Sequence, residues 1–77
     1  MTSEVSKETK LILIQQERNN WLNTIEILVI RNRVNKRLKN EQAVQANEKE
    51  LERCEIALEE LDAIEKEINA GVDVSAN

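Results

Sequence analysis

The chain has 77 residues, of which 40% are hydrophobic and 34% are charged, with a formal net charge of -4, no His, no Pro, one Gly and one Cys. This length allows one small domain; the apolar content excludes a disordered polyanion, and the single Cys54 excludes an internal disulfide. Leu, Ile, Glu, Lys, Gln and Ala dominate, a mixture that favours helices, so we expect one all-α domain over residues 1–77.

The apolar runs are too short to cross a bilayer. The longest are LILI (11–14) and ILVI (27–30), whereas a membrane-spanning helix needs about 20 apolar residues. The N-terminal segment mixes acidic residues with lysines and has no extended apolar core, so it does not resemble a secretory signal. These features predict a cytoplasmic protein without membrane contact.

The first helix is predicted from about residue 6 to residue 39. Ser3 or Ser6 can supply its N-cap. No strong helix stop follows before Asn40. The pair Asn19-Asn20 is the weakest point, and a break there would give three helices in place of two.

A turn is predicted at about residues 40–46, followed by a second helix at about 47–70 and a short tail at 71–77. Asn47 and Glu50 have the spacing of a capping box, with Asn in place of the usual Ser or Thr. Gly71 can take the left-handed conformation that ends helices. The elements therefore predict a long antiparallel helical hairpin.

The second helix has one apolar seam and a largely acidic remainder. Its heptad spacing is typical of coiled coils and predicts contact with one neighbouring helix. The seam consists of Val44, Asn47, Leu51, Cys54, Leu58, Leu61 and Ile68, flanked by Ala57 and Ile64.

The first helix is apolar on two nearly opposite sides. One side carries Leu11, Ile14, Trp21, Leu22, Ile25, Leu28 and Val29; the other carries Ile27, Ile30, Val34 and Leu38, here called the outer stripe, with Ile12 further back. A single neighbour covers roughly a third to a half of a helix, so it cannot cover both sides. Because burying each large aliphatic side chain contributes about 1.5–3 kcal/mol, we predict that the outer stripe is an interface. The simplest form is a homodimer that makes a coiled-coil-like four-helix bundle.

Three further residues of the first helix have predicted places. Trp21 is expected inside the hairpin, near the end remote from the turn. Asn32 and Asn35 flank the outer stripe. If either is buried between copies, it would fix their register, as polar residues do in coiled coils.

A run of basic residues overlaps the outer stripe. Arg31, Arg33, Lys36, Arg37 and Lys39 form this basic cluster. In a hairpin the cluster lies beside the start of the second helix, and we expect it to pair there with Glu41, Glu48, Glu50 and Glu52. Alternatively, it binds nucleic acid or an anionic nucleotide ligand. The acidic net charge and the lack of an aromatic platform weigh against this second hypothesis.

The chain offers little for catalysis. It has no His, the commonest general base and metal ligand. Cys54 lies on the apolar seam, which favours a buried, inert thiol. Glu52, Glu55 and Glu59 share a face, but carboxylate metal sites in helical bundles also use His, so a solvated acidic face is the better interpretation. We therefore predict no enzymatic activity and no cofactor or metal.

These features together predict a non-enzymatic helical interaction protein. It would be a small adaptor, an assembly chaperone or an inhibitor, of the kind that phages and mobile elements encode. Its predicted partners are further copies of itself, as a homodimer or higher oligomer, and a protein target. Nucleic acid is the less favoured partner.

Overall fold

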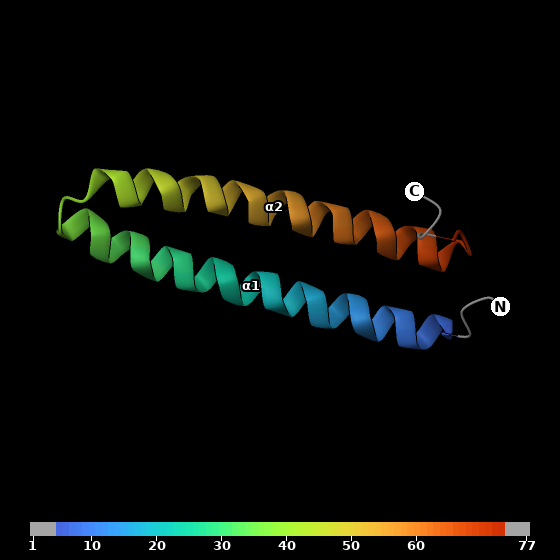
Figure 1. Cartoon of the computed structure of the whole chain (residues 1–77). Helices are drawn as coiled ribbons and strands as arrows, with labels where there is room; N and C mark the ends of the chain where they lie inside the picture. The colour runs from blue at the N-terminus through green and yellow to red at the C-terminus, as the bar shows by residue number, and fades with distance from the viewer. Residues whose placement is uncertain (1–4, 74–77) are drawn as a thin grey trace.

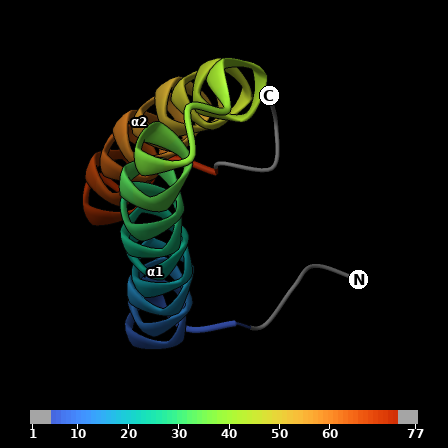
Figure 2. The ribbon, with the colours of Figure 1, turned by 90° about the vertical axis from the view of Figure 1, so that its left-hand side faces the viewer.

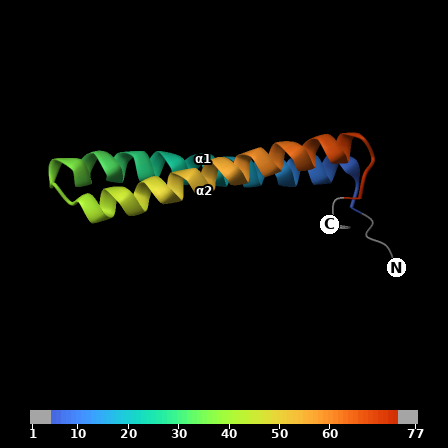
Figure 3. The ribbon, with the colours of Figure 1, turned by 90° about the horizontal axis from the view of Figure 1, so that it is seen from above.

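The computed structural model describes residues 5–73, which form two antiparallel helices, α1 (Lys7–Arg37) and α2 (Glu41–Asn69), joined by a tight turn (Figure 1). The predicted all-α helical hairpin is confirmed, and no strand occurs in residues 5–73. The hairpin is elongated, with extents of 54 × 21 × 20 Å. Figure 2 views the hairpin from the end that carries the turn. Seen from above (Figure 3), the two helices cross at a shallow angle, which is typical of coiled-coil packing.

Ser6 is the residue that caps α1. Its hydroxyl accepts a hydrogen bond from the backbone N–H of Thr9 at 3.2 Å, and Glu8 lies in the first turn beside the positive end of the helix. The alternative cap, Ser3, lies outside the described residues. The predicted tail is described only as far as residue 73.

The helix α1 continues through Asn19 and Asn20, so the alternative with a third helix is wrong. Both asparagines are exposed, and each reduces helix propensity by less than about 0.7 kcal/mol relative to Ala. The Asn19 side chain accepts a hydrogen bond from Gln15 at 3.2 Å within the helix. Continuous packing of the buried face on both sides of this pair outweighs the small local penalty.

The turn is shorter than predicted, and α2 begins at Glu41 rather than near residue 47. Lys39 adopts a left-handed conformation with φ 60. The N–H of Lys39 then donates to Lys36 O at 3.1 Å, and the N–H of Asn40 donates to Asn35 O at 2.9 Å. This is the Schellman pattern that ends helices, formed without glycine.

Asn40 takes the capping role that the sequence had suggested for Asn47. Its side chain accepts from the backbone N–H of Ala43 at 3.1 Å, so one residue closes the Schellman turn and caps the next helix. Asn47 lies inside α2 and faces the other helix. The predicted boundary was wrong because lysine gives no sequence signal for a left-handed residue.

Replacing Lys39 by glycine is expected to raise the free energy of unfolding by about 0.5–1 kcal/mol. A left-handed conformation costs an L residue about 1–2 kcal/mol, and glycine avoids most of this cost while adding entropy to the unfolded chain. Urea unfolding followed by circular dichroism measures the change, with Lys39→Ala as the control that should give no gain. Gly71→Ala is the converse substitution. Gly71 ends α2 with φ 80 and has open space around it, so alanine there meets no clash but takes on the cost of the left-handed conformation and should lower the stability. A destabilised Lys39→Gly variant would show that the turn has another conformation.

The interior of the hairpin is narrow. A cluster of Ile14, Leu61 and Ile68 lies toward the end remote from the turn. Trp21 packs against this cluster and is partly buried, as predicted. The predicted seam of α2 is also confirmed, with Cys54 fully enclosed. The buried residues, at less than a tenth exposed, are Ile14, Leu28, Asn32, Cys54, Leu61 and Ile68.

Two residues assigned to the inner side of α1 lie at its edge instead. Leu22 is 44% exposed and Val29 is 49% exposed. Each follows a seam residue, Trp21 or Leu28, and is therefore rotated by about 100° away from the contact line. The seam position that follows Leu28 along the contact is occupied by Asn32, which is buried within the hairpin. Asn32 therefore does not flank the outer stripe as predicted.

Neither described helix has an apolar stretch of the length and hydropathy needed to cross a membrane.

Candidate functional site

The outer stripe lies on the side of α1 turned away from α2. At 100° per residue its centre is about 125° from the seam around Trp21 and Leu28. The exposed fractions of its side chains are 48% for Ile27, 61% for Ile30, 54% for Val34 and 68% for Leu38. The hairpin alone therefore leaves all four largely in contact with solvent.

The half of the stripe nearest the turn forms a shallow depression. Ile30, Val34 and Leu38 provide its apolar floor, while Arg33 and Arg37 line one flank. This depression has the form of a groove that accepts an apolar side chain from a neighbouring helix. Its cationic border would favour acidic groups at the edge of the neighbour.

The same face of α1 carries a second apolar patch nearer its N-terminus. Ile12 is 57% exposed and Leu13 is 50% exposed. Between this patch and the outer stripe the face is polar, with the exposed side chains of Gln16, Asn19, Asn20 and Asn23. The outer face of α1 is therefore apolar at both ends and amide-rich in the middle.

The basic cluster does not pair with α2 as predicted. In the part of the chain that the structure describes, none of Arg31, Arg33, Lys36, Arg37 and Lys39 forms an ion pair. All five basic side chains are exposed. These cations are thus available for contacts outside the hairpin.

The structure also divides the basic cluster between two surfaces. Arg33 and Arg37 lie beside the outer stripe. Lys36 and Lys39 lie at the turn, in a second hollow that also contains Glu41 and Glu48. A nucleic-acid groove needs cations that follow one backbone path, and this distribution around α1 does not favour such a site.

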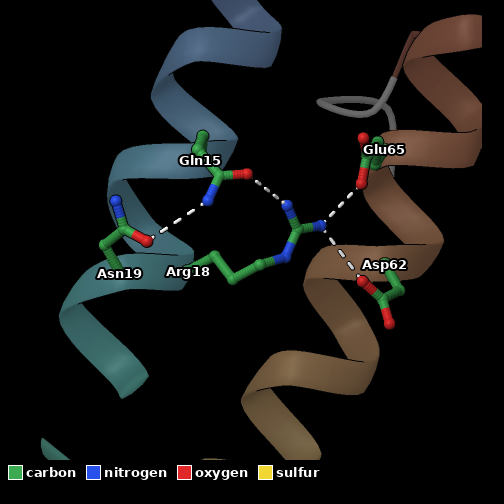
Figure 4. A network of polar contacts seen from close by, with 5 residues as sticks. All are labelled: Gln15, Arg18, Asn19, Asp62 and Glu65. Atoms are coloured by element: carbon green, nitrogen blue, oxygen red, sulfur yellow. Dashed lines mark hydrogen bonds and ion pairs between the residues drawn. The ribbon is translucent and has the colours of Figure 1, made fainter. Parts of the chain in front are cut away.

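The ion pairs between the helices involve a residue that the sequence analysis missed. Arg18 Nη2 lies 2.6 Å from Glu65 Oε1 and 3.0 Å from Asp62 Oδ1 on α2 (Figure 4). Its other terminal nitrogen donates to Gln15 Oε1 at 2.8 Å, and Gln15 is in turn bonded to Asn19. Arg18 lies seven residues after Leu11 and seven before Ile25. The heptad spacing therefore predicts that Arg18 lies on the line of α1 residues that contacts α2.

The environment of Arg18 favours its charged form. The hydrogen bond to Glu65 raises the pKa of Arg18 above its ordinary value, partial burial opposes this effect, and the hydrogen bond to Asp62 adds to it. Arg18 is far from the basic cluster and contacts acids of its own chain. Its ion pairs join α1 to α2.

Asn32 and Asn47 meet across the apolar seam. Asn47 Nδ2 donates to Asn32 Oδ1 at a long 3.5 Å. A polar pair inside a helical seam disfavours shifted registers, because any shift places an amide against aliphatic side chains. The pair therefore specifies the alignment of the hairpin itself.

The candidate reactive groups are one thiol and three carboxylates of α2. Cys54 is a free thiol and fully buried, as predicted from its seam position. Glu52, Glu55 and Glu59 are exposed on α2. Within residues 5–73, no three side chains of His, Cys, Asp or Glu are grouped so that they could hold a metal ion.

Comparisons of the chain with protein-family models, with curated proteins and with solved structures give no match.

Proposed function

We propose that this protein is a non-enzymatic helical interaction protein that docks on a protein target and on itself through the outer stripe. The observation that carries this proposal is the set of four large aliphatic side chains that the hairpin leaves 48–68% exposed. An adaptor, an assembly chaperone and an inhibitor all act in this way, by presenting a helical face to another protein.

The free energy available from covering the stripe is substantial for a small protein. Each side chain is about half exposed, so covering the remainder contributes about half of the 1.5–3 kcal/mol of full burial. For the four residues together this amounts to about 3–6 kcal/mol. The total stability of a small domain is about 5–15 kcal/mol, so this surface favours a partner that covers it.

The charges around the stripe bear on the choice of partner. Arg33 and Arg37 border the groove without ion-pair partners among the described residues. Cations at the rim of an apolar groove favour a neighbour with acidic edges and speed its approach, while adding little to affinity. We therefore expect the target to present an apolar helix face with Asp or Glu at its border.

The test is an affinity capture from a lysate of the source organism with tagged protein. The wild-type protein is expected to retain a specific protein that the double variant Ile30→Asp, Val34→Asp loses, because a charge on the groove floor must be desolvated on docking.

The matched control for this capture is Ile56→Asp. Ile56 is 65% exposed on α2, outside the stripe, so this variant should retain the same protein as the wild type. Identical retention by all three proteins would contradict docking through the outer stripe.

A further inference from the structure

We propose that the occupant of the outer face of α1 is the same face of a second copy, packed antiparallel, with the two copies related by a twofold axis near Asn23. This inference rests on the proposed function and specifies one partner and its orientation. A protein target would then have to displace the second copy.

The distribution of side chains along α1 carries the inference. Ile12 and Leu13 form an apolar patch near one end of the outer face, and Ile30, Val34 and Leu38 form another near the opposite end. Exposed amides separate the patches. When two such helices pack antiparallel, each apolar patch meets the other patch of its neighbour, and the amides meet in the middle.

This pairing has one favoured register. If residues whose numbers sum to about 45 lie level with each other, Ile12 and Leu13 fall between Ile30 and Val34 of the second copy. The same register places Asn23 close to its own twin. The resulting interface is isologous, so both copies bury identical surfaces and the assembly closes at two chains.

The basic cluster decides the orientation. In a parallel pair, the two basic clusters would lie level at one end of the assembly. Arg31 of each copy would then face the flank of the other copy that carries Arg33 and Arg37, across helices about 8–10 Å apart, a separation close to the Debye length of about 8 Å at physiological salt. In the antiparallel register, the two clusters lie about 37 Å apart at 1.5 Å per residue, so their repulsion is screened. Arg37 instead lies level with Glu8 of the other copy, on the same flank of the stripe, and both side chains are exposed and free to pair.

The outer side of α2 is a weaker candidate for the occupant. Its acidic residues would suit the cations beside the stripe, but Ile56 is its only large apolar residue among those described as exposed. Exposed ion pairs contribute little to association, whereas apolar burial provides most of the driving force. The apolar content of the α1 face therefore favours α1 over α2 as the occupant.

Disulfide cross-linking tests both the partner and its orientation. In a Cys54→Ala background, Asn23→Cys is expected to form a covalent dimer under mild oxidation, because each new thiol lies beside its twin. Gln16→Cys alone is expected to stay unlinked, since its twin is about 20 Å away and a disulfide needs Cα atoms within about 7 Å. A mixture of Gln16→Cys and Ile30→Cys copies should give the mixed disulfide.

The exposed position Glu59→Cys on α2 measures the background of chance collisions. Efficient linking of both Asn23→Cys and Gln16→Cys would show a parallel pair and overturn the proposal. Linking of Asn23→Cys no faster than Glu59→Cys would also overturn it, whether the protein is a monomer or an oligomer through another face.

The cross-linking experiment and the target capture can succeed or fail independently of each other. Loss of target capture by the stripe variant, together with no cross-link at Asn23, would retain the docking function and reject the second copy. A cross-link at Asn23 with identical capture by all variants would retain the paired α1 helices and reject docking on a target.

Discussion

Replacing Leu61 by alanine is expected to lower the free energy of unfolding by about 2–5 kcal/mol. Leu61 is 9% exposed and packs in one cluster with Ile14 and Ile68, at the end remote from the turn. Removing its isobutyl group loses apolar burial and leaves a cavity that two long helices cannot readily close. In a hairpin with so few buried residues, this loss is a large share of the total stability.

Guanidinium unfolding followed by circular dichroism measures this loss. The control is Ile56→Ala, an equally simple truncation of an aliphatic residue that is 65% exposed, which is expected to change stability by less than about 0.5 kcal/mol. Equal effects of Leu61→Ala and Ile56→Ala would contradict the packing of α1 on α2 along this seam.

Replacing Ile30 by aspartate is expected to weaken self-association by about 100-fold or more. Ile30 is 61% exposed in the hairpin, so covering it contributes about 1–2 kcal/mol per copy, and the substitution acts on both copies of a pair. The introduced carboxylate must also be desolvated, which adds to the penalty. A total of about 3 kcal/mol corresponds to a factor of about 100 in the dissociation constant.

The helix itself is expected to tolerate this change, because an acid at position 30 lies one turn before Arg33 and Val34 and attracts the arginine. Ile30→Ala serves as a milder second variant, with a smaller loss of affinity in the same direction. Ile56→Asp carries the same chemical change outside the stripe and should associate like the wild type. Sedimentation equilibrium gives the dissociation constants, and equal weakening by Ile56→Asp and Ile30→Asp would refute a specific role for the stripe.

The hairpin and its inner seam were predictable because the sequence of α2 has a single apolar face. Leu58, Leu61 and Ile68 recur at heptad spacing while most other positions are acidic, so only one face can be buried. The exposure of Ile30 and its neighbours was predictable for a related reason. Two apolar sides on one helix exceed what a single partner helix covers, whichever side it selects.

The turn was not predictable to the residue. Sequence signals for left-handed residues are carried mainly by glycine, and here Lys39 takes that conformation because its neighbours complete the hydrogen bonds around it. Asn40 and Asn47 are chemically identical candidates for a cap. Their contacts distinguish them: Asn40 accepts the hydrogen bond from Ala43 N–H, whereas Asn47 contacts Asn32.

The polar contacts within the hairpin were the hardest part to anticipate. Charge counts suggested that the cations of residues 31–39 pair with the start of α2. Among the described residues, the ion pairs between the helices instead join Arg18 to Asp62 and Glu65. Net charge describes long-range attraction, whereas an ion pair needs side chains on facing positions of two helices. Arg18 meets this condition because it occupies the contact line between Leu11 and Ile25.

The most direct test of a shared apolar face is the concentration dependence of the wild-type protein, from low to high micromolar, by sedimentation equilibrium and thermal unfolding. A reversible dimer is predicted, with a melting temperature that rises with concentration because association stabilises only the folded chain. A single folded monomer throughout that range, with an unchanging melting temperature, would contradict the account.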